Sequence, residues 1–417
     1  MASIMQFDFN LSGAGVIAEG PMKKGAWFLS ARRSYLDVII KEILKEVSSI
    51  PIFGDFQSKL AYDLSPKHKI TLLEIFGFDG IDILKDDANA NYYGDNRTRQ
   101  NTAGANWQFL WGNKGFSNTS ISHTLTKFDL NWLQTRSDSV YFDNDSREQE
   151  WRLQNVNYYR LHPAHKLEFG VEAKFLETRY DNFFAEYDDL LGNRPPAFRF
   201  DKNISAMKLA SFASYNWKPL PRLTLTPGVR VDYFDYNTNT LVSPRFSFSY
   251  QLTPLTSIND ATGVFYQNLP MILLAQNPAN KKLRDPSAQH YVLGIHHLIT
   301  ENTRLTIEAY EKRYDHLPLD PAQPSLFIID QSVYQEYFLN HERLVDNGKA
   351  SARGVEVTLQ KKLAKDLYGM AGASYSAISF IETAGGSALS FQQFKFDRLS
   401  RRVECLRAEK HLSLSLE

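Results

Sequence analysis

Long stretches of this chain alternate apolar and polar residues with a period of two. In Arg222–Tyr233, leucines and valines recur two residues apart, opposite threonine, arginine and aspartate. The same alternation marks Leu167–Phe175, Leu305–Ala309 and Val355–Leu359. Side chains of a β-strand point to its two faces in turn, so this period is typical of strands with one apolar and one polar face. The pattern predicts an all-β chain.

The links between the alternating segments differ regularly in length. Short links with Pro, Gly or Asn chemistry suit hairpin turns and occur at Ser65–His68, Asn113–Gly115, His162–His165, Lys218–Pro221, Thr253–Leu255, Thr300–Thr303 and Ala364–Asp366. Between them lie longer polar inserts, namely Leu36–Phe53, Gly80–Arg99, Thr135–Ser146, Asp181–Asn203, Asn268–Asp285 and Asp315–Gly348, with a brief exception near Asn237–Thr240. Short turns at one end and long loops at the other are typical of a bacterial outer-membrane barrel. We therefore predict a transmembrane antiparallel β-barrel.

The number and length of the strands separate this barrel from soluble all-β folds. Counting between links gives about seventeen strands, from a short pair near Gln6–Glu19 to a last one near Leu367–Ser379. Many are roughly twice as long as the ~5–6 residues usual in soluble sheets. A propeller would show a repeat of ~40–50 residues, and none is found. A soluble propeller or a pair of sandwiches is therefore the weaker alternative.

Composition agrees with this fold and excludes several functions. Lys+Arg 47 equals Asp+Glu 47, so no net field favours nucleic acid, and one cysteine allows no internal disulfide. Aromatic residues make up 13%, which suits interfacial girdles. No apolar run approaches the ~20 residues of a spanning helix. Met1–Pro21 lacks the basic and apolar regions of a signal peptide.

One insert is expected to be helical. Apolar residues in Leu36–Val47 recur at helical spacing, and Asp37 can pair with Lys41 one turn later. The basic excess of a lipid-binding helix is missing. We therefore expect a loop helix over the barrel mouth rather than a membrane-surface helix.

Five segments, in this order along the chain, resemble the barrel of TonB-dependent outer-membrane receptors. They are Ala18–Pro21, Leu29–Asp37, His290–Gly294, Thr306–Tyr310 and Ala352–Glu356. The subgroup with a carboxypeptidase-regulatory-like N-terminal domain is the most similar. The resemblance covers roughly Gln6 to Phe380 and rests on the order and spacing of the segments, since each one alone is a weak signal.

The resemblance implies a barrel of about 22 strands closed by a globular plug. It also implies loops that capture a scarce ligand (a ferric siderophore, cobalamin or a glycan) and a TonB complex that pulls an N-terminal box. This chain departs from that pattern, because no signal peptide, plug or box is visible and only about seventeen strands can be counted. We expect residues 1–380 to be a partial barrel and residues 381–417 an atypical tail, so that the chain is a fragment inactive on its own.

No enzyme motif or cofactor fingerprint is visible, so we expect neither catalytic residues nor a cofactor. His290, His296 and His297 would point to both faces of one strand, which argues against a shared metal. The carboxylates of Glu148 and Glu150 are expected at a loop edge, where acids are usually solvated. We predict no metal site.

Ligand contacts are expected from aromatic and basic side chains in the long inserts, where rings can stack and guanidinium groups can donate hydrogen bonds. The candidates are Tyr92, Tyr93, Arg97, Tyr187, Arg194, Tyr337, Asn340 and Arg343. Packing of the loops on one another is the alternative role for each of them.

The predicted function is the barrel portion of an energy-coupled receptor in the outer membrane of a Gram-negative bacterium. Its expected partners are outer-membrane lipid, a small-molecule ligand and, through an N-terminal region absent from this chain, the TonB complex. Nucleic acid is not an expected partner. A passive porin would have shorter loops and 16 or 18 strands. A barrel enzyme would need a Ser/His or Asp/His set near one rim, which we cannot assemble from the sequence.

Overall fold

The computed structural model describes residues 3–10, 12–43, 49–85, 92–186, 197–321, 328, 341, 343–364, 367–384, 387–396, 402–407 and 410–415. Within them the chain forms two compact units. The first comprises Met1–Tyr159, Phe169–Ser211 and Tyr233–Asn239, and the second Arg160–Glu168, Phe212–Asp232 and Thr240–Glu417. No helix among the described residues combines the length and apolar character needed to cross a membrane.

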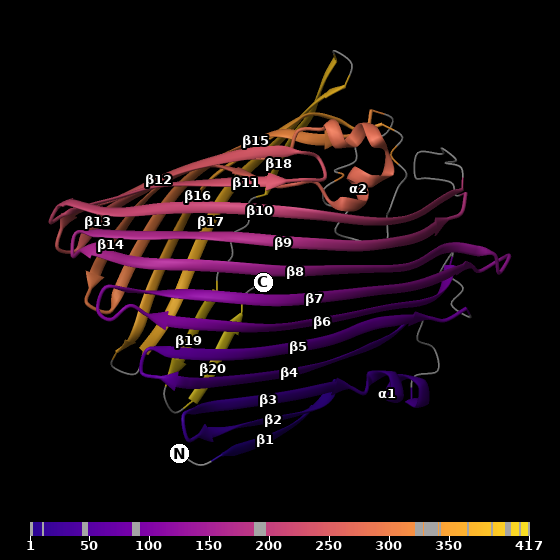
Figure 1. The fold of residues 1–417 in the computed structure, drawn as a ribbon, viewed down its shortest axis with the longest axis horizontal. Coiled ribbons are helices and arrows are strands. Elements are labelled where there is room, and N and C mark those ends of the chain that lie inside the picture. Colours follow the sequence, from indigo (N-terminus) through magenta and orange to yellow (C-terminus); the bar gives the residue numbers. More distant parts are fainter. Residues whose placement is uncertain are drawn as a thin grey trace. The chain divides into compact units, whose positions relative to one another are not determined.

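Antiparallel strands joined in chain order make up most of the first unit (Figure 1). Its elements are β1 (Ile4–Asn10), β2 (Gly13–Met22), β3 (Gly25–Ser34), α1 (Leu36–Ile43), β4 (Ser49–Ser65), β5 (His68–Ile83), β6 (Tyr92–Leu110), β7 (Gly115–Gln134) and most of β8 (Val140–His162). Three further strands contribute residues to both units, namely β9 (His165–Phe184), β10 (Phe198–Leu220) and β11 (Leu223–Phe234).

The second unit repeats the arrangement, with antiparallel pairing from β12 to β18. Its elements are β12 (Asn239–Thr253), β13 (Thr256–Tyr266), α2 (Met271–Gln276), the 3-10 helix η1 (Pro278–Lys282), β14 (Ser287–Thr300), β15 (Thr303–Leu319), β16 (Val345–Ala364), β17 (Leu367–Ala384) and β18 (Ser387–Phe396). A separate hairpin pairs β19 (Arg402–Arg407) with β20 (Lys410–Ser415).

The predicted strand count is confirmed. The last strand expected from the sequence, near Leu367–Ser379, is β17, and among the described residues β18 follows it. The short links also lie where predicted, for example between β4 and β5 at Ser65–His68 and between β14 and β15 at Thr300–Thr303.

The predicted extent of the inserts is wrong in several places, because the strands continue into them. The insert Thr135–Ser146 reduces to residues 135–139, since β8 begins at Val140. The insert Gly80–Arg99 reduces in the same way to residues 84–91. Strand residues beyond the bilayer have no lipid on one side, so the contrast between apolar and polar faces that marks a strand disappears there.

The predicted loop helix is present as α1, which contacts β4. Its described part ends at Ile43, and the remainder of the expected helix, residues 44–48, lies outside the described residues. Asp37 pairs at 2.9 Å with Arg33, which precedes it by four residues and lies in β3.

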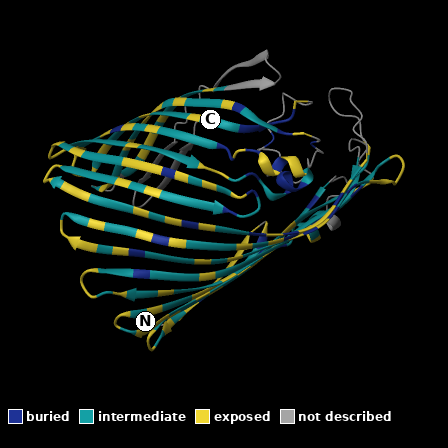
Figure 2. Ribbon diagram, turned by 45° about the horizontal axis from the view of Figure 1, so that its top comes forward, coloured by how far each residue is buried: buried dark blue, intermediate teal, exposed yellow. Residues whose placement is uncertain are grey.

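In both units, the strands have one apolar and one polar face, as the alternation predicted. In the second unit, cross-strand rows place Leu293 beside Ala309 and Val355, and Ile295 beside Ile307 and Val357. The alternate rows are polar and include Glu308, Glu356, Thr306 and Thr358. We call the two sides the apolar face and the polar face. Figure 2 shows the resulting alternation of exposure along the strands.

The first unit has the same division into two faces, and the pairing of its strands orients the segments His68–Asp79 and Trp151–Leu161, which carry bulky residues on both sides. On β5, Leu72 lies in register with Ala105, Ile121 and Leu153 on the apolar face, whereas Leu73 faces the polar side. The polar face carries rows such as Gln100, Thr126 and Glu148. The segment Trp151–Leu161 therefore presents Trp151 and Leu153 to the apolar side.

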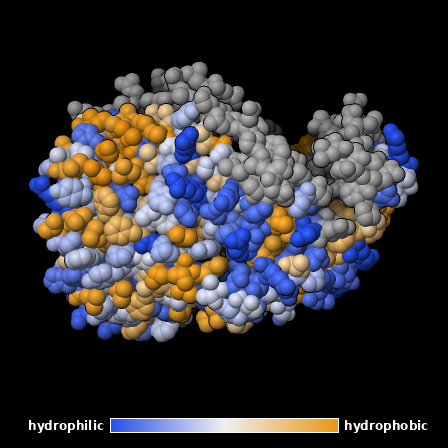
Figure 3. Space-filling view, turned by 90° about the horizontal axis from the view of Figure 1, so that it is seen from above, coloured by the Kyte–Doolittle hydropathy of each residue, from blue (hydrophilic) through white to orange (hydrophobic). Residues whose placement is uncertain are grey.

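The apolar face is exposed rather than buried. Leu293 is 52% exposed, Leu153 50% and Val171 57%, and hydrophobic side chains gather in patches on the surface seen in Figure 3. A soluble protein rarely leaves so much contiguous apolar surface in water. At the turn-side end of this face, His68 stacks on Phe109 at 4.6 Å and on Trp107 at 5.7 Å, and the Trp107 Nε1 donates to His68 Nδ1 at 3.1 Å. A lipid-facing band ending in an aromatic girdle accounts for both observations.

A pair of substitutions on adjacent residues tests the assignment of the faces. We expect Leu293→Arg to lower the free energy of unfolding by ~2–4 kcal/mol, the cost of an arginine near the bilayer midplane. Val292→Arg places the same side chain on the polar face and is expected to cost clearly less. Urea unfolding in phosphatidylcholine vesicles, followed by tryptophan fluorescence, measures both. Equal losses for the two variants would show that the faces are assigned wrongly.

Candidate functional site

Three consecutive polar-face positions of β8 are each bonded to β9. Glu148 accepts a hydrogen bond from the Tyr180 hydroxyl at 2.9 Å, and Glu150 accepts one from the Lys174 ammonium at 3.2 Å. Arg152 forms an ion pair with Glu172, whose side chain is only 9% exposed. These acids belong to a strand, so their expected position at a loop edge was wrong. The polar face thus carries a ladder of three carboxylates and two cations, which suits contact with polar groups.

An aromatic cluster closes the loop end of the same face. Trp132 and Phe142 are buried and pack at 5.8 Å, and Tyr92 stacks on Trp132 at 4.7 Å. Phe184 stacks on Phe142 at 4.4 Å. Among the described residues, the Trp132 Nε1 and Asn144 Oδ1 are buried without a hydrogen-bond partner. The cluster therefore packs stacked rings around one enclosed donor and one enclosed acceptor.

Two of the residues predicted to contact a ligand already have partners. The Tyr93 hydroxyl donates to Asp138 at 2.7 Å, and Lys85 pairs with the same carboxylate. Arg97 pairs with Asp82 and donates to the Ile81 carbonyl at 3.2 Å. Because β6 is extended, Arg97 points to the apolar face, away from the side on which Tyr92 joins the aromatic cluster.

All three of these residues were expected in a loop, and all three lie in β6. Gly94 follows Tyr93 with a φ of 141°, and a Cβ at Gly94 would lie 2.0 Å from the Asn131 carbonyl oxygen. Glycine is required at that point because L side chains rarely adopt this conformation. The backbone conformation at the start of β6 therefore depends on Gly94. Tyr92 packs in the aromatic cluster, whereas the Tyr93 hydroxyl bonds Asp138.

In the second unit, the insert between β13 and β14 forms a packed loop core. The side chains of Ile272, Leu273 and Leu274 in α2 are buried, and the Asn280 side chain donates to the Leu273 carbonyl at 2.8 Å. His341 bonds Asp320 at 2.7 Å, with 3% and 6% of their side chains exposed. The His341 backbone N–H donates to the Gln276 side-chain oxygen at 3.2 Å, which joins the insert to the segment between β15 and β16.

The remaining predicted residues divide into two groups. Arg343 is exposed, near the buried His341. Tyr187, Arg194, Tyr337 and Asn340 lie outside the described residues. The structure therefore brings none of the eight candidates together into one described site, and their role in ligand binding stays a prediction.

The histidines of β14 are separated as expected. The His297 ring bonds the Thr256 hydroxyl at 2.9 Å on the apolar face, and His296 lies 3.8 Å from Glu308 on the polar face. Across the described part of the chain, no group of three or more His, Cys, Asp or Glu residues has an arrangement that could hold a metal ion.

Comparison with known families identifies the class. Residues 54–402 match the family described as TonB dependent receptor-like, beta-barrel. This match covers most of the chain, and the exposed apolar face, the aromatic girdle and the polar face all agree with it. The chain belongs to the TonB-dependent receptor β-barrel family, and its fold is a transmembrane antiparallel β-barrel. The polar face is therefore the lumen side and the apolar face the lipid side.

Solved structures show the same fold at low sequence identity. The ferripyoverdine receptor of the Pseudomonas aeruginosa outer membrane is 13% identical with a TM-score of 0.65, over 93% of this chain and 56% of that one. The P. aeruginosa ferric enterobactin receptor PfeA is 15% identical with a TM-score of 0.63, over 91% and 65%. The copper transporter OprC is 12% identical with a TM-score of 0.63, over 92% and 64%. The chain thus spans less than two thirds of each protein's length.

None of the curated proteins compared with this chain matches it significantly.

The loop core yields a prediction with a pH dependence. Arg284 donates to Asp346 at 2.7 Å from its backbone and 2.9 Å from its side chain. Burial alone would raise the pKa of the Asp346 carboxyl, but the hydrogen bonds and charge of Arg284 hold it below its ordinary value of 3.8. A carboxyl with a lowered pKa stabilises the fold fully above that ordinary value, and the contribution is lost as pH falls through the lower, folded value.

We therefore expect Arg284→Gln to increase protease cleavage between β13 and β14 several-fold at neutral pH. The difference between variant and wild type should narrow as pH falls below the ordinary value of 3.8 and through the lower pKa of Asp346, because that carboxyl then becomes protonated. Limited digestion with pepsin and with a neutral protease measures both. Arg304→Gln, which removes an exposed arginine at the turn end, serves as the control. A difference independent of pH would contradict the role of Asp346.

Proposed function

We propose that this chain is the barrel portion of an outer-membrane receptor that takes up a scarce ligand by an energy-coupled mechanism. The observation that carries the proposal is the family match over residues 54–402. The polar ladder of β8 and β9 supports it, because a lumen wall of paired charges suits the passage of a polar solute past a removable plug. The same family match supports a receptor role over an enzymatic one.

A ferric siderophore is the ligand class we favour. Two of the structures with the same fold are named as ferripyoverdine and ferric enterobactin receptors, and a third as a copper transporter. In the aromatic cluster, the partly exposed Tyr92 ring stacks on the buried Trp132 at the loop end of the polar face. A partly exposed ring of this kind suits the flat chelating groups of a siderophore. Cobalamin and glycans are the alternatives.

The other candidate functions fit less well. A passive porin would not need a packed loop core such as that of α2. A barrel enzyme would need an accessible acid–base pair, and the Asp320–His341 pair is almost fully buried. We propose that this pair holds the loop core together.

We further propose that the full receptor includes a plug and a TonB-interacting segment beyond this chain, and that the 417 residues alone do not transport. The lengths of the structures with the same fold support this proposal, since the chain spans 56% of the ferripyoverdine receptor. A barrel with missing strands would leave backbone N–H and C=O groups unpaired in hydrocarbon, at several kcal/mol each.

Uptake measurements in a strain of the source bacterium that lacks this locus test the proposal. The complete locus is expected to restore accumulation of ⁵⁵Fe-siderophore, and a proton uncoupler should abolish it. A strain given only the 417-residue chain should stay at the deletion level. Uptake that is insensitive to the uncoupler would favour the porin. Uptake by the short chain alone would contradict the fragment proposal.

Labelled cobalamin and oligosaccharides, tested in the same strains, identify the ligand class. Restoration of one of these and not of iron would contradict the siderophore assignment while preserving the receptor function. No energy-dependent uptake of any substrate would contradict the receptor function itself.

A further inference from the structure

We propose that the lipid side of the first unit carries a binding site for an anionic, phosphate-bearing lipid of the outer leaflet. The site consists of three cations in register on adjacent strands, Arg99 on β6, Lys127 on β7 and Arg147 on β8, which we call the basic row. The proposal depends on the membrane location of the barrel and not on which ligand it transports.

The pairing of the strands fixes the geometry of the basic row. Arg99 is the partner of Lys127, and Lys127 is the partner of Arg147. Neighbouring strands lie ~4.8 Å apart, so three positive charges lie side by side on one face. Like charges directly opposite one another in a sheet are destabilising. An anion placed over the row would relieve that repulsion.

Few protein groups compensate these charges. No hydrogen bond or ion pair within the described residues engages the Arg99 guanidinium, and Arg147 donates only to the Gln149 side chain, at 3.1 Å. Lys127 lies 3.4 Å from Asp145 and 3.9 Å from Asp129. Both acids are one step nearer the loops, so the row is open on its membrane side.

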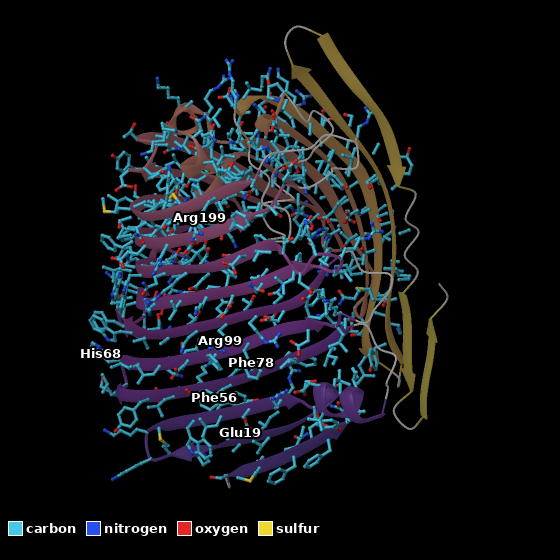
Figure 4. All side chains as sticks on the ribbon, turned by 90° about the vertical axis from the view of Figure 1, so that its right-hand side faces the viewer. Glu19, Phe56, His68, Phe78, Arg99 and Arg199 are labelled. Atoms are coloured by element: carbon cyan, nitrogen blue, oxygen red, sulfur yellow. The ribbon has the colours of Figure 1, made fainter. Side chains whose placement is uncertain are left out.

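The neighbours of the basic row on β5 and β3 are an aromatic ring and an arginine. On the same face, Phe78 of β5 is the partner of Arg99, and Figure 4 labels both residues on their adjacent strands. The Arg33 guanidinium of β3 lies 5.7 Å from the centre of the Phe78 ring, across Gly54. Arg33 is neutralised by Asp37, so it contributes a donor rather than a net charge.

The height of the basic row matches the headgroup region. From Leu110, at the turn end of β6, to Arg99 the strand rises about 36 Å, or about 28 Å along the membrane normal at a tilt of ~40°. The lipid-facing band of an outer-membrane barrel is ~25 Å tall. The row therefore lies at the loop-side edge of the band, where lipid phosphates are found, and not in the aqueous loops where a soluble anion or a protein would bind.

A depression on the same face can receive the acyl chains. It has a volume of about 800 Å³, its floor includes Ala103 and Ala105 of β6, and Leu72 and Ile121 form part of its walls. Ala103 lies about 13 Å along the strand from Arg99, on the membrane side. Small residues between bulky ones let a chain approach the sheet closely.

Two ionisable groups also line this depression. Glu74 accepts a hydrogen bond from Asn101 at 3.2 Å, and the His123 ring packs at a tilt against Trp151, with 4.5 Å between the ring centres. Glu74 is four positions along β5 from Phe78, about 13 Å from the basic row. It therefore does not contact the proposed phosphate.

Native mass spectrometry of the full chain, purified in detergent with equal dioleoylphosphatidylglycerol and dioleoylphosphatidylcholine, tests the site. Wild type should retain phosphatidylglycerol preferentially. The Arg99→Gln/Arg147→Gln variant should bind it at least about tenfold more weakly, because each basic group near an anionic lipid contributes roughly a factor of five. Lys69→Gln/Lys312→Gln makes the same charge change on the polar face, away from the depression, and should bind like wild type. Heat-modifiable gel migration confirms folding.

Three results would overturn the proposal. One is equal retention of the two lipids by wild type, and another is an unchanged preference in the Arg99→Gln/Arg147→Gln variant. A third is inorganic phosphate bound by wild type and lost in that variant with no lipid retained, which would show a soluble-anion site. If the variant does not fold, a salt titration of the wild type tests the site instead. Raising NaCl from about 50 to about 500 mM should release phosphatidylglycerol but not phosphatidylcholine. Unchanged retention of phosphatidylglycerol at the higher salt would contradict the site.

Discussion

Backbone hydrogen bonding within hydrocarbon is the constraint on which the rest of this structure depends. No water is available in a bilayer core to pair with N–H and C=O groups, so each strand must be paired on both sides over its full depth. β6 and β7 satisfy this requirement with an unbroken register from Tyr92 and Gln134 to Leu110 and Phe116. Such ladders force side chains to alternate between lipid and lumen, and the period of two in the sequence is the consequence.

That consequence explains how much of the fold could be predicted from the sequence. Where both lipid and lumen are present, the alternation has high contrast, and the rows that join Leu305 to Leu359 and Ile307 to Val357 follow from it. Above the bilayer the contrast is lost, and the start of β8 was therefore taken for a loop. Phe142 illustrates the difficulty, because it is buried by the aromatic cluster and not by lipid.

The candidate site was less predictable than the fold, for a different physical reason. Tyr93 and Arg97 have the chemistry of ligand contacts, but partners distant in sequence, Asp138 and Asp82, occupy them. The ladder that joins Arg152 to Glu172 was missed, because the offset between two strands decides which charges meet. A single sequence shows which face a residue takes but not its cross-strand partner.

The register of the strands also decides which charges lie beside one another in the basic row. On the lipid face of the second unit, Arg353 is the partner of Glu311, which also lies 2.9 Å from Arg313, so that a carboxylate lies between two cations within the sheet. In the first unit, the partner of Arg99 is Lys127 and the partner of Lys127 is Arg147, with no acid in the row. In the first unit the acids lie in the next row, where Asp129 and Asp145 pair with Lys127. Arg99 and Arg147 have no carboxylate partner among the described residues, and an external anion at the membrane surface suits these two guanidinium groups.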